Sequence, residues 1–265
     1  MRVSICQTEI VWEDKMKNIE SARSMIRASS SQNAELVLFP EMSFTGFSMN
    51  VALTGEDDGK TLSIMKGLAE ENKICVGFGW VRVGAGGRGE NHYSVVGENG
   101  ALMSDYIKIH SFSYADENKY FTQGDNICVF NINGTYASTF ICYDLRFPEV
   151  FQAVSDTASV IIVAANWPVA RKEHWRCLLR ARALENQSYV VGINCAGKQN
   201  DMLYPGCSGI IDPDGNTLLE LGETEEHAVF DIPDKTDLHR KIFPLKKDRR
   251  LDLYKELLYE KKGGH

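Results

Sequence analysis

The chain has 265 residues, 43% of them hydrophobic and 25% charged, and a formal net charge of −7. This length and composition are typical of one large globular α/β domain. The acidic balance argues against nucleic-acid binding, because no basic stripe is available to neutralise phosphates. No apolar run approaches the roughly 20 residues that span a bilayer, and Met1 to Gln7 lack the apolar core of a signal peptide. We therefore expect a cytoplasmic protein with no membrane partner.

Cysteine and histidine spacing gives no sign of a metal site or a disulfide framework. The seven cysteines are scattered without a C-x-x-C pair, which is typical of reduced thiols in a protein without an export signal. The six histidines show no metal-ligand spacing such as H-x-x-x-H. We expect neither a metal nor a cofactor.

The N-terminal segment predicts a βαβ unit. Residues 2–7 and 35–39 are apolar enough for buried strands. Between them, apolar residues recur at helical spacing: Met16, Ile19, Ala22 and Ile26. This order favours parallel strands with the helix over one face of the sheet. Glu41 follows the second strand, where a carboxylate would cap the next turn, pair with a surface arginine or act as a general base.

The next segment predicts a helix, a strand and a hairpin. Residues 59–72 fit a helix and residues 73–81 a strand. The glycine-rich stretch 83–89 is interpreted as a flexible hairpin tip, because it does not join a strand to a helix as a phosphate-binding loop does. Residues 92–96 and 102–109 flank an Asn-Gly turn and predict an antiparallel hairpin.

A long polar connection, residues 111–126, follows Lys108 at the end of that hairpin. Structureless loops of this length are uncommon in compact domains unless they serve a site. A second hairpin around Asn133-Gly134 then leads into the apolar run that ends at Cys142.

The remaining chain continues the alternation of helices and strands. The predicted elements are a helix at 149–153, a strand at 158–165, a helix with Trp175, Leu178, Leu179 and Ala183 on its apolar face, a strand at 188–194 and a turn at 212–216. Charged residues dominate after Asp231, with a short helix around 251–259. No linker or repeat divides the chain, so we predict one domain over residues 1–265 with a C-terminal tail from about 233.

Cys142 lies where an α/β enzyme would hold a nucleophile, between a buried strand and a segment with helical potential. The alternative is a buried structural cysteine. Glu41, Lys108 and Glu117 also stand at strand ends or in a loop beside one. A carboxylate, an ammonium and a thiol are a sufficient set for acyl transfer, because they supply a base, charge for the oxyanion and a nucleophile.

Four stretches in this order resemble the nitrilase superfamily of carbon–nitrogen hydrolases: residues 38–47, 106–110, 142–149 and 165–168. The resemblance extends from Arg2 to about Ile232. It implies an α/β fold, a four-layer α-β-β-α sandwich, and an active site built on a Glu-Lys-Cys triad.

The resemblance assigns a role to each matching position. It makes Glu41 the general base, Lys108 the oxyanion stabiliser and Cys142 the nucleophile that forms a thioester. The backbone N–H of Tyr143 would complete the oxyanion hole. Glu117 is similar in placement to a second glutamate that orients the lysine and the substrate, although a solvated loop carboxylate remains the alternative.

Several flanking stretches look most like the bacterial omega-amidase branch, whose members hydrolyse dicarboxylic monoamides such as 2-oxoglutaramate. A free substrate carboxylate needs a cation, for which Arg146 is one candidate, with an ion pair to Asp144 or Glu149 as its alternative. Arg171 and Arg176 are further candidates. The other residues expected at the substrate are Phe44, Tyr114, Phe121, Asn166 and Trp167.

Three rival interpretations remain open. The first is another amidase of the superfamily, acting on an N-carbamoyl amine or on deaminated glutathione, with a true nitrilase less favoured. The second is a catalytically silent binding protein. The third is a thiol hydrolase that depends on His110 or His174. The resemblance also implies a homodimer or higher homo-oligomer.

Overall fold

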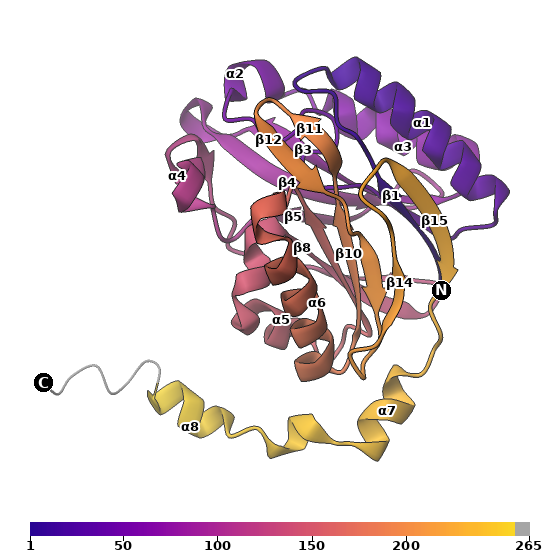
Figure 1. Cartoon of the computed structure of the whole chain (residues 1–265), viewed down its shortest axis with the longest axis vertical. Helices are drawn as coiled ribbons and strands as arrows, with labels where there is room; N and C mark the ends of the chain where they lie inside the picture. Colours follow the sequence, from indigo (N-terminus) through magenta and orange to yellow (C-terminus); the bar gives the residue numbers. More distant parts are fainter. Residues whose placement is uncertain (258–265) are drawn as a thin grey trace, which may run out of the picture.

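The computed structural model describes residues 1–257, which build two β-sheets packed face to face (Figure 1). The first sheet has the order β15-β1-β2-β3-β4-β5, with β6 beside β4. Strand β2 pairs parallel with β1 and β3, β6 pairs parallel with β4, and the pairs β15-β1, β3-β4 and β4-β5 are antiparallel. The bounds are β1 Arg2–Gln7, β2 Leu36–Leu38, β3 Cys75–Val83, β4 Gly89–Val96, β5 Leu102–Ile107, β6 Phe121–Thr122 and β15 Glu226–Asp231.

The second sheet has the order β14-β13-β10-β9-β8-β7. Its three central strands β8, β9 and β10 run parallel and are apolar along most of their length, as strands covered on both faces must be. The hairpin β11-β12 stands outside both sheets. The bounds are β7 Val129–Ile132, β8 Thr135–Ile141, β9 Val160–Ala165, β10 Tyr189–Asn194, β11 Ala196–Gln199, β12 Met202–Pro205, β13 Gly209–Ile211 and β14 Thr217–Glu220.

Helices cover the outer face of each sheet, so the predicted four-layer α-β-β-α sandwich is confirmed. Helices α1 (Lys15–Ser31) and α3 (Lys60–Asn72) pack on the first sheet, and α5 (Pro148–Val154) and α6 (Lys172–Asn186) lie over the second (Figure 1). The short helices are α2 Val51–Thr54, α4 Glu117–Tyr120, α7 Thr236–Ile242 and α8 Leu251–Lys255.

Helix α1 forms and docks as its sequence pattern predicts. The Asp14 carboxylate accepts a hydrogen bond from the Lys17 N–H and caps the helix start. Ile19 and Ile26 are buried against the sheet, whereas Met16 is 62% exposed. The buried apolar stripe therefore begins at Ile19, one turn later than the spacing predicts.

The largest apolar cluster lies between the two sheets and continues under α6. It joins Leu38 and Tyr93 of the first sheet to Phe140 and Ile162 of the second, and reaches Trp175 of α6. Burying this many large side chains fixes the two sheets relative to each other. Strand ends at the shared edge are thereby held in fixed positions.

Pairing of distant segments is where the sequence prediction was incomplete. Strand β15 pairs antiparallel with β1 although the two lie at opposite ends of the chain, and the β11-β12 hairpin was not anticipated. The connection 111–126 contains a 3-10 turn at Ser113–Ala115, helix α4 and strand β6. Such elements are too short to show a periodic pattern.

The C-terminal segment 233–257 leaves the two sheets and extends past the ends of α5 and α6 (Figure 1). It is held to the body where the Gln187 side chain donates to the Phe243 carbonyl oxygen and Arg240 donates to that of Ala158. The helix predicted around 251–259 is present as α8, and its predicted end lies outside the described residues. One domain over residues 1–265 therefore stays a prediction. No helix within residues 1–257 is both long and apolar enough to cross a membrane.

Candidate active site

The groups singled out in the sequence gather at one edge of the sandwich. Glu41 follows β2, Lys108 follows β5, Glu117 begins α4 and Cys142 follows β8. Lys108 Nζ lies 2.8 Å from Glu41 Oε1 and 2.9 Å from Glu117 Oε2. All three charged side chains are at most 2% exposed. The prediction that these strand ends converge is confirmed, and Glu117 is not a solvated loop carboxylate.

Each carboxylate in this cluster has further donors. Glu41 Oε2 accepts from the Asn166 backbone N–H at 3.0 Å, and Glu117 Oε2 accepts from the Phe112 N–H at 2.5 Å. The Asn91 side-chain amide donates to both carboxylates. Buried charges are tolerated only when they are paired and hydrogen-bonded, and this network meets that requirement.

The loop that carries Glu41 passes unusually close to strand β3. Met42 has a φ of +42°, which is a left-handed conformation that is uncommon for a residue with a side chain. At Gly79 of β3, a Cβ atom would lie 2.3 Å from the Met42 nitrogen and 2.9 Å from Glu41 Cα. Only glycine allows this approach, so Gly79 determines where the Glu41 carboxylate stands.

Cys142 lies at the start of a 3-10 turn, Cys142–Arg146, and has a φ of +46°. Such strain persists only where the surroundings hold it, and here the Asp144 carboxylate does so. Asp144 Oδ2 accepts from the Ile141 N–H and the Tyr106 hydroxyl, and Oδ1 accepts from the His110 N–H. The turn directs the Cys142 thiol into a cavity.

Burial and charge set the protonation states of the cluster. Burial alone would lower the pKa of Lys108, but Glu117 and Glu41 raise it above its usual value, so the ammonium persists. Burial, with the negative charge of Glu41, raises the pKa of the Cys142 thiol well above its ordinary value although Lys108 opposes this. Burial also raises the pKa of Glu117. A thiol whose pKa is raised is a weak nucleophile unless a base removes its proton.

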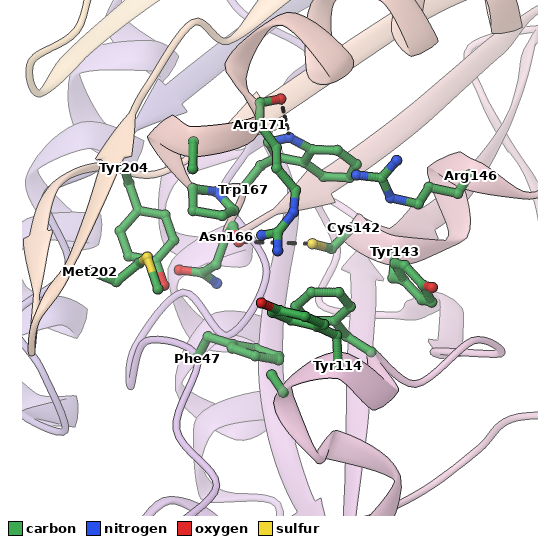
Figure 2. A pocket seen from close by; sticks show the side chains of 14 residues that line it. Phe47, Tyr114, Cys142, Tyr143, Arg146, Asn166, Trp167, Arg171, Met202 and Tyr204 are labelled. Carbon is green, nitrogen blue, oxygen red and sulfur yellow. Dashed lines mark hydrogen bonds between the residues drawn. The ribbon is translucent and has the colours of Figure 1, made fainter.

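A cavity of about 310 Å³ opens over Cys142 (Figure 2). Of the residues predicted to contact substrate, Tyr114, Asn166 and Trp167 line it, as do Tyr143 and Arg146. Phe44 and Phe121 do not line it, because Phe44 packs against Phe78 in the core and Phe121 is buried beside Met42. The prediction that Phe44 and Phe121 line the substrate pocket was therefore wrong.

Two arginines line the cavity and differ from the third candidate. The Arg146 guanidinium lies 4.8 Å from the Trp167 ring, and the Arg171 guanidinium lies 5.4 Å from the Phe112 ring. Neither has a carboxylate partner among the described residues, so the predicted alternative of an ion pair from Arg146 to Asp144 or Glu149 is not observed. Arg176 instead pairs with two glutamates away from the cavity.

The two histidines of the rival mechanism contact residues other than Cys142. His110 Nδ1 lies 2.8 Å from Asp144 Oδ1, and its ring stacks on Phe147 at 3.8 Å. His174 is exposed and contacts the Arg146 guanidinium at 3.3 Å. Within residues 1–257, the Cys142 thiol donates weakly to the Asn166 carbonyl oxygen and to neither histidine. The described residues include no group of three or more ligating side chains placed to hold a metal ion.

Sequence reasoning missed several residues at the site. Phe47 lines the cavity and lies under the Lys108 ammonium at 5.2 Å, and the β11-β12 hairpin contributes Met202 and Tyr204 (Figure 2). Gln199 of the same hairpin donates to the Asn166 side chain at 3.0 Å. The hairpin has no distinctive pattern, and only the position of Phe47 within the stretch 38–47 was a usable signal.

A thiol that lines a cavity, with a buried carboxylate and a buried ammonium beside it, is the set of groups that acyl transfer to cysteine requires, and it matches the class of hydrolases that use a cysteine nucleophile. The family model described as carbon-nitrogen hydrolase matches residues 2–237. The chain therefore belongs to the carbon-nitrogen hydrolase family and is an enzyme acting on carbon–nitrogen bonds other than peptide bonds.

Curated relatives match over nearly the whole chain. A 2-oxoglutaramate amidase of Bacillus subtilis is 33% identical and aligned over 95% of this chain and 98% of its own. A protein described as a hydrolase in the agr operon of Staphylococcus aureus is 32% identical over 96% and 100%. Omega-amidase YafV of Escherichia coli is 30% identical over 82% and 84%.

Solved structures share the fold. A CN-hydrolase superfamily protein of Xanthomonas campestris, which carries an arsenic adduct in its active site, superposes with a TM-score of 0.89 at 28% identity over 94% and 97% of the two chains. An amidase of Nesterenkonia sp. AN1 solved with acrylamide has a TM-score of 0.87 at 24% identity over 97% of each chain. These likenesses agree with the four-layer architecture.

Proposed function

We propose that this carbon–nitrogen hydrolase is an omega-amidase that releases ammonia from small dicarboxylic monoamides such as 2-oxoglutaramate. The observation that carries the proposal is the pair of guanidiniums, Arg146 and Arg171, at a cavity whose floor holds Cys142. A guanidinium without a carboxylate partner is suited to bind a free carboxylate in two parallel hydrogen bonds. The names of the relatives from B. subtilis and E. coli support the same substrate class.

The size of the cavity supports a small substrate. Its volume of about 310 Å³ is at the lower end of the range for ligand pockets. Aromatic side chains, including Phe47 and Trp167, line it. Arg171 extends from one side over the ring of Tyr114 on the other, which places a cation at the mouth (Figure 2). A substrate whose amide lies at Cys142 and whose free carboxylate lies at the mouth, near Arg171, fits this arrangement.

In the first half of the proposed reaction, Cys142 Sγ attacks the amide carbon while its proton moves to the Glu41 carboxylate. The tetrahedral oxyanion would be stabilised by the Lys108 ammonium and the Tyr143 backbone N–H, which is one of the first N–H groups of the 3-10 turn and has no partner inside it. Glu41 then returns the proton to the departing nitrogen. The carbon–nitrogen bond breaks, ammonia leaves and a thioester remains on Cys142.

In the second half, a water molecule takes the place of ammonia. Glu41 removes one proton from the water as its oxygen attacks the thioester carbon, and the same oxyanion donors act again. The carbon–sulfur bond then breaks, and the proton held by Glu41 returns to the Cys142 sulfur. The products are the dicarboxylic acid and a restored thiol. Glu117 holds Lys108 in place throughout through its two contacts at 3.1 and 2.9 Å.

A substrate panel tests the substrate class. Ammonia release is measured from 2-oxoglutaramate, glutaramate, N-carbamoylputrescine and a small nitrile. We expect the first two to be turned over fastest, whereas a preference for N-carbamoylputrescine would favour the rival amidase and fast nitrile hydrolysis would favour a nitrilase. Equal and very slow turnover of every compound would contradict the omega-amidase proposal.

Arginine variants test the carboxylate-binding cation. Arg171→Met and Arg146→Met should each raise KM for 2-oxoglutaramate by roughly tenfold to a hundredfold, and leave turnover of a neutral amide such as propionamide nearly unchanged. Arg176→Met is the matched control, because Arg176 pairs with glutamates away from the cavity. Unchanged KM in both cavity variants would exclude these residues as the carboxylate site.

Cys142→Ala separates an enzyme from a silent binding protein with the same fold. We expect no ammonia release from the variant, and an acyl adduct on Cys142 in the intact mass of the wild-type protein during turnover. His110→Ala and Glu41→Gln, compared side by side, show which residue is the base. The histidine-dependent mechanism predicts an equal loss of kcat in both variants, whereas the Glu-Lys-Cys mechanism predicts a much smaller loss in His110→Ala. Wild-type activity in Cys142→Ala would overturn the thioester mechanism.

We also infer a cytoplasmic homo-oligomer. The supporting observation is the apolar surface on the C-terminal segment, where Ile242 is 75% exposed, Leu238 60% and Leu251 59%. Large exposed apolar side chains gathered on one segment are typical of protein interfaces. Light scattering coupled to gel filtration measures the assembly, and a monomer at micromolar concentration would contradict it.

A further inference from the structure

Asn91 stands at the centre of the buried cluster, although it was not predicted from the sequence and does not line the cavity. It lies on β4, is 1% exposed and points its side chain at the two carboxylates. Its Nδ2 donates to Glu41 Oε1 at 2.8 Å and to Glu117 Oε1 at 3.2 Å. One amide nitrogen therefore joins the proposed general base to the glutamate that orients Lys108.

The side-chain oxygen of Asn91 is buried and has no hydrogen-bond partner among the described residues. Leaving a buried acceptor unpaired costs free energy, so the amide must gain more in its observed orientation than in the reverse one. Reversal would place this oxygen against two carboxylate oxygens. The negative charge of Glu41 and Glu117 thus fixes the amide with both hydrogens facing the acids.

Charge balance explains why such a donor is needed. The cluster holds two carboxylates and one ammonium whose side chains are each at most 2% exposed, and Lys108 Nζ must serve both acids. A neutral donor between them adds a hydrogen bond to each without adding charge. The backbone carbonyl of Asn91 also accepts from the Lys108 N–H at 2.9 Å, so the same residue anchors the lysine.

We propose that Asn91 is a positioning residue that keeps Glu41 and Glu117 ionised in the resting enzyme and correctly spaced around Lys108. This inference rests on the proposed roles of Glu41 and Lys108. Besides Lys108 and Cys142, the Cys195 thiol and the Tyr204 hydroxyl are titratable groups that lie near Glu41. Neither donates to the oxygens that Asn91 contacts.

Three variants of Asn91 separate the effect of losing the hydrogen-bond donor from the effect of changing the side-chain volume. Asn91→Leu removes the donor, Asn91→Asp keeps the size but replaces the donor with an acceptor, and Asn91→Ser is smaller but keeps a hydroxyl donor. We expect kcat for 2-oxoglutaramate to fall by roughly tenfold to a hundredfold in Asn91→Leu, further in Asn91→Asp and least in Asn91→Ser. KM should change little, because Asn91 does not line the cavity.

The pH profile is the readout that a purely structural role would not move. Losing a donor to the ionised acids favours their protonated forms, so the acidic limb of kcat should move upward by about one pH unit in Asn91→Leu. Alkylation of Cys142 by iodoacetamide, followed by peptide mass, should show the same displacement. This second readout needs no amide substrate.

Asn186 is the matched control, because it too is a fully buried asparagine with an unpaired side-chain oxygen, at the end of α6. Asn186→Leu should lose thermal stability like Asn91→Leu while its kcat and acidic limb stay those of the wild type. The inference is overturned if Asn91→Leu keeps the wild-type acidic limb, or if Asn91→Ser is less active than Asn91→Asp. Full activity in Cys142→Ala would instead refute the thioester mechanism itself.

Discussion

Neighbouring residues of strand β4 hold two acidic clusters on opposite faces of the first sheet. Asn91 contacts Glu41 and Glu117 on the cavity side, whereas His92 lies 2.9 Å from Asp105 and 3.2 Å from Glu90 on the other. Each residue lies between two carboxylates. The carboxylates on the cavity side are at most 1% exposed, whereas those of Asp105 and Glu90 are 31% and 20% exposed.

Access to water gives the two clusters opposite electrostatic character. Burial would raise the pKa of Asp105, but the His92 imidazole and the Ser94 hydroxyl lower it below its usual value. Burial raises the pKa of Glu117, and Lys108 does not fully offset it. Surroundings that lower the pKa of an acid stabilise the fold at neutral pH. Surroundings that raise it make the carboxylate a stronger base and destabilise the fold at neutral pH. Perturbation of the second kind is typical of reactive sites.

Glu41→Gln should lower kcat more than any other substitution in the two clusters. Without a base the neutral Cys142 thiol is not deprotonated, so kcat should fall by roughly a thousandfold. Glu90→Gln, in the other cluster, should leave kcat unchanged. The measurement is ammonia release from 2-oxoglutaramate, and a loss smaller than tenfold in Glu41→Gln would remove Glu41 from the role of base.

Gly79→Ala should disturb the cavity-side cluster without changing any of its charges. The added Cβ would meet the backbone of Met42 and Glu41 and displace the carboxylate, and a misplacement of about 1 Å costs roughly a hundredfold in kcat. Gly67→Ala is the control, because its Cβ would meet nothing within 4 Å on helix α3. That variant should gain about 0.5–1 kcal/mol of stability. Equal activity of the two variants would show that the loop tolerates movement.

Glu117→Gln should lower kcat by roughly tenfold yet stabilise the fold. A carboxyl whose pKa is raised in the folded state contributes stability at low pH, and that contribution is lost as pH rises above its ordinary value of 4.5. The variant should therefore melt at a higher temperature than the wild type at about pH 8 and at a similar temperature at about pH 4. A lower melting temperature at about pH 8 would show that the Lys108 pair outweighs burial.

Asp105→Asn should have the smallest effect and the opposite sign. A carboxylate with a lowered pKa stabilises the fold above its ordinary pKa, and the contribution is lost as pH falls through its folded value. We expect a loss of roughly 1 kcal/mol near pH 7 that disappears near pH 3, with kcat per folded molecule unchanged. Urea unfolding at several pH values measures it, and a pH-independent loss would assign the effect to packing.

The strand ends that carry the reactive groups were predictable because their signals are local. Glu41 and Cys142 each follow an apolar run that predicts a buried strand, Lys108 follows the second strand of a hairpin marked by an Asn-Gly turn, and such strand ends can meet at one edge of the fold. The order of the motifs then indicated the family and its four-layer fold. The same reasoning erred at Phe44, because the curve of the loop after Glu41 turns that ring into the core and presents Phe47 instead.

By itself, the sequence indicated the chemical groups of the site through the residue types at predicted strand ends, and it indicated the family and its sandwich through the resemblance of four motifs in order. Only the tertiary structure decided that Asn91 joins the two acids, that Gly79 sets the position of Glu41 and that Arg171 faces the cavity with no carboxylate partner within residues 1–257. Those facts depend on distances between elements far apart in the chain. Such distances are fixed by sheet register and loop packing, which leave no pattern in the residues of any one segment.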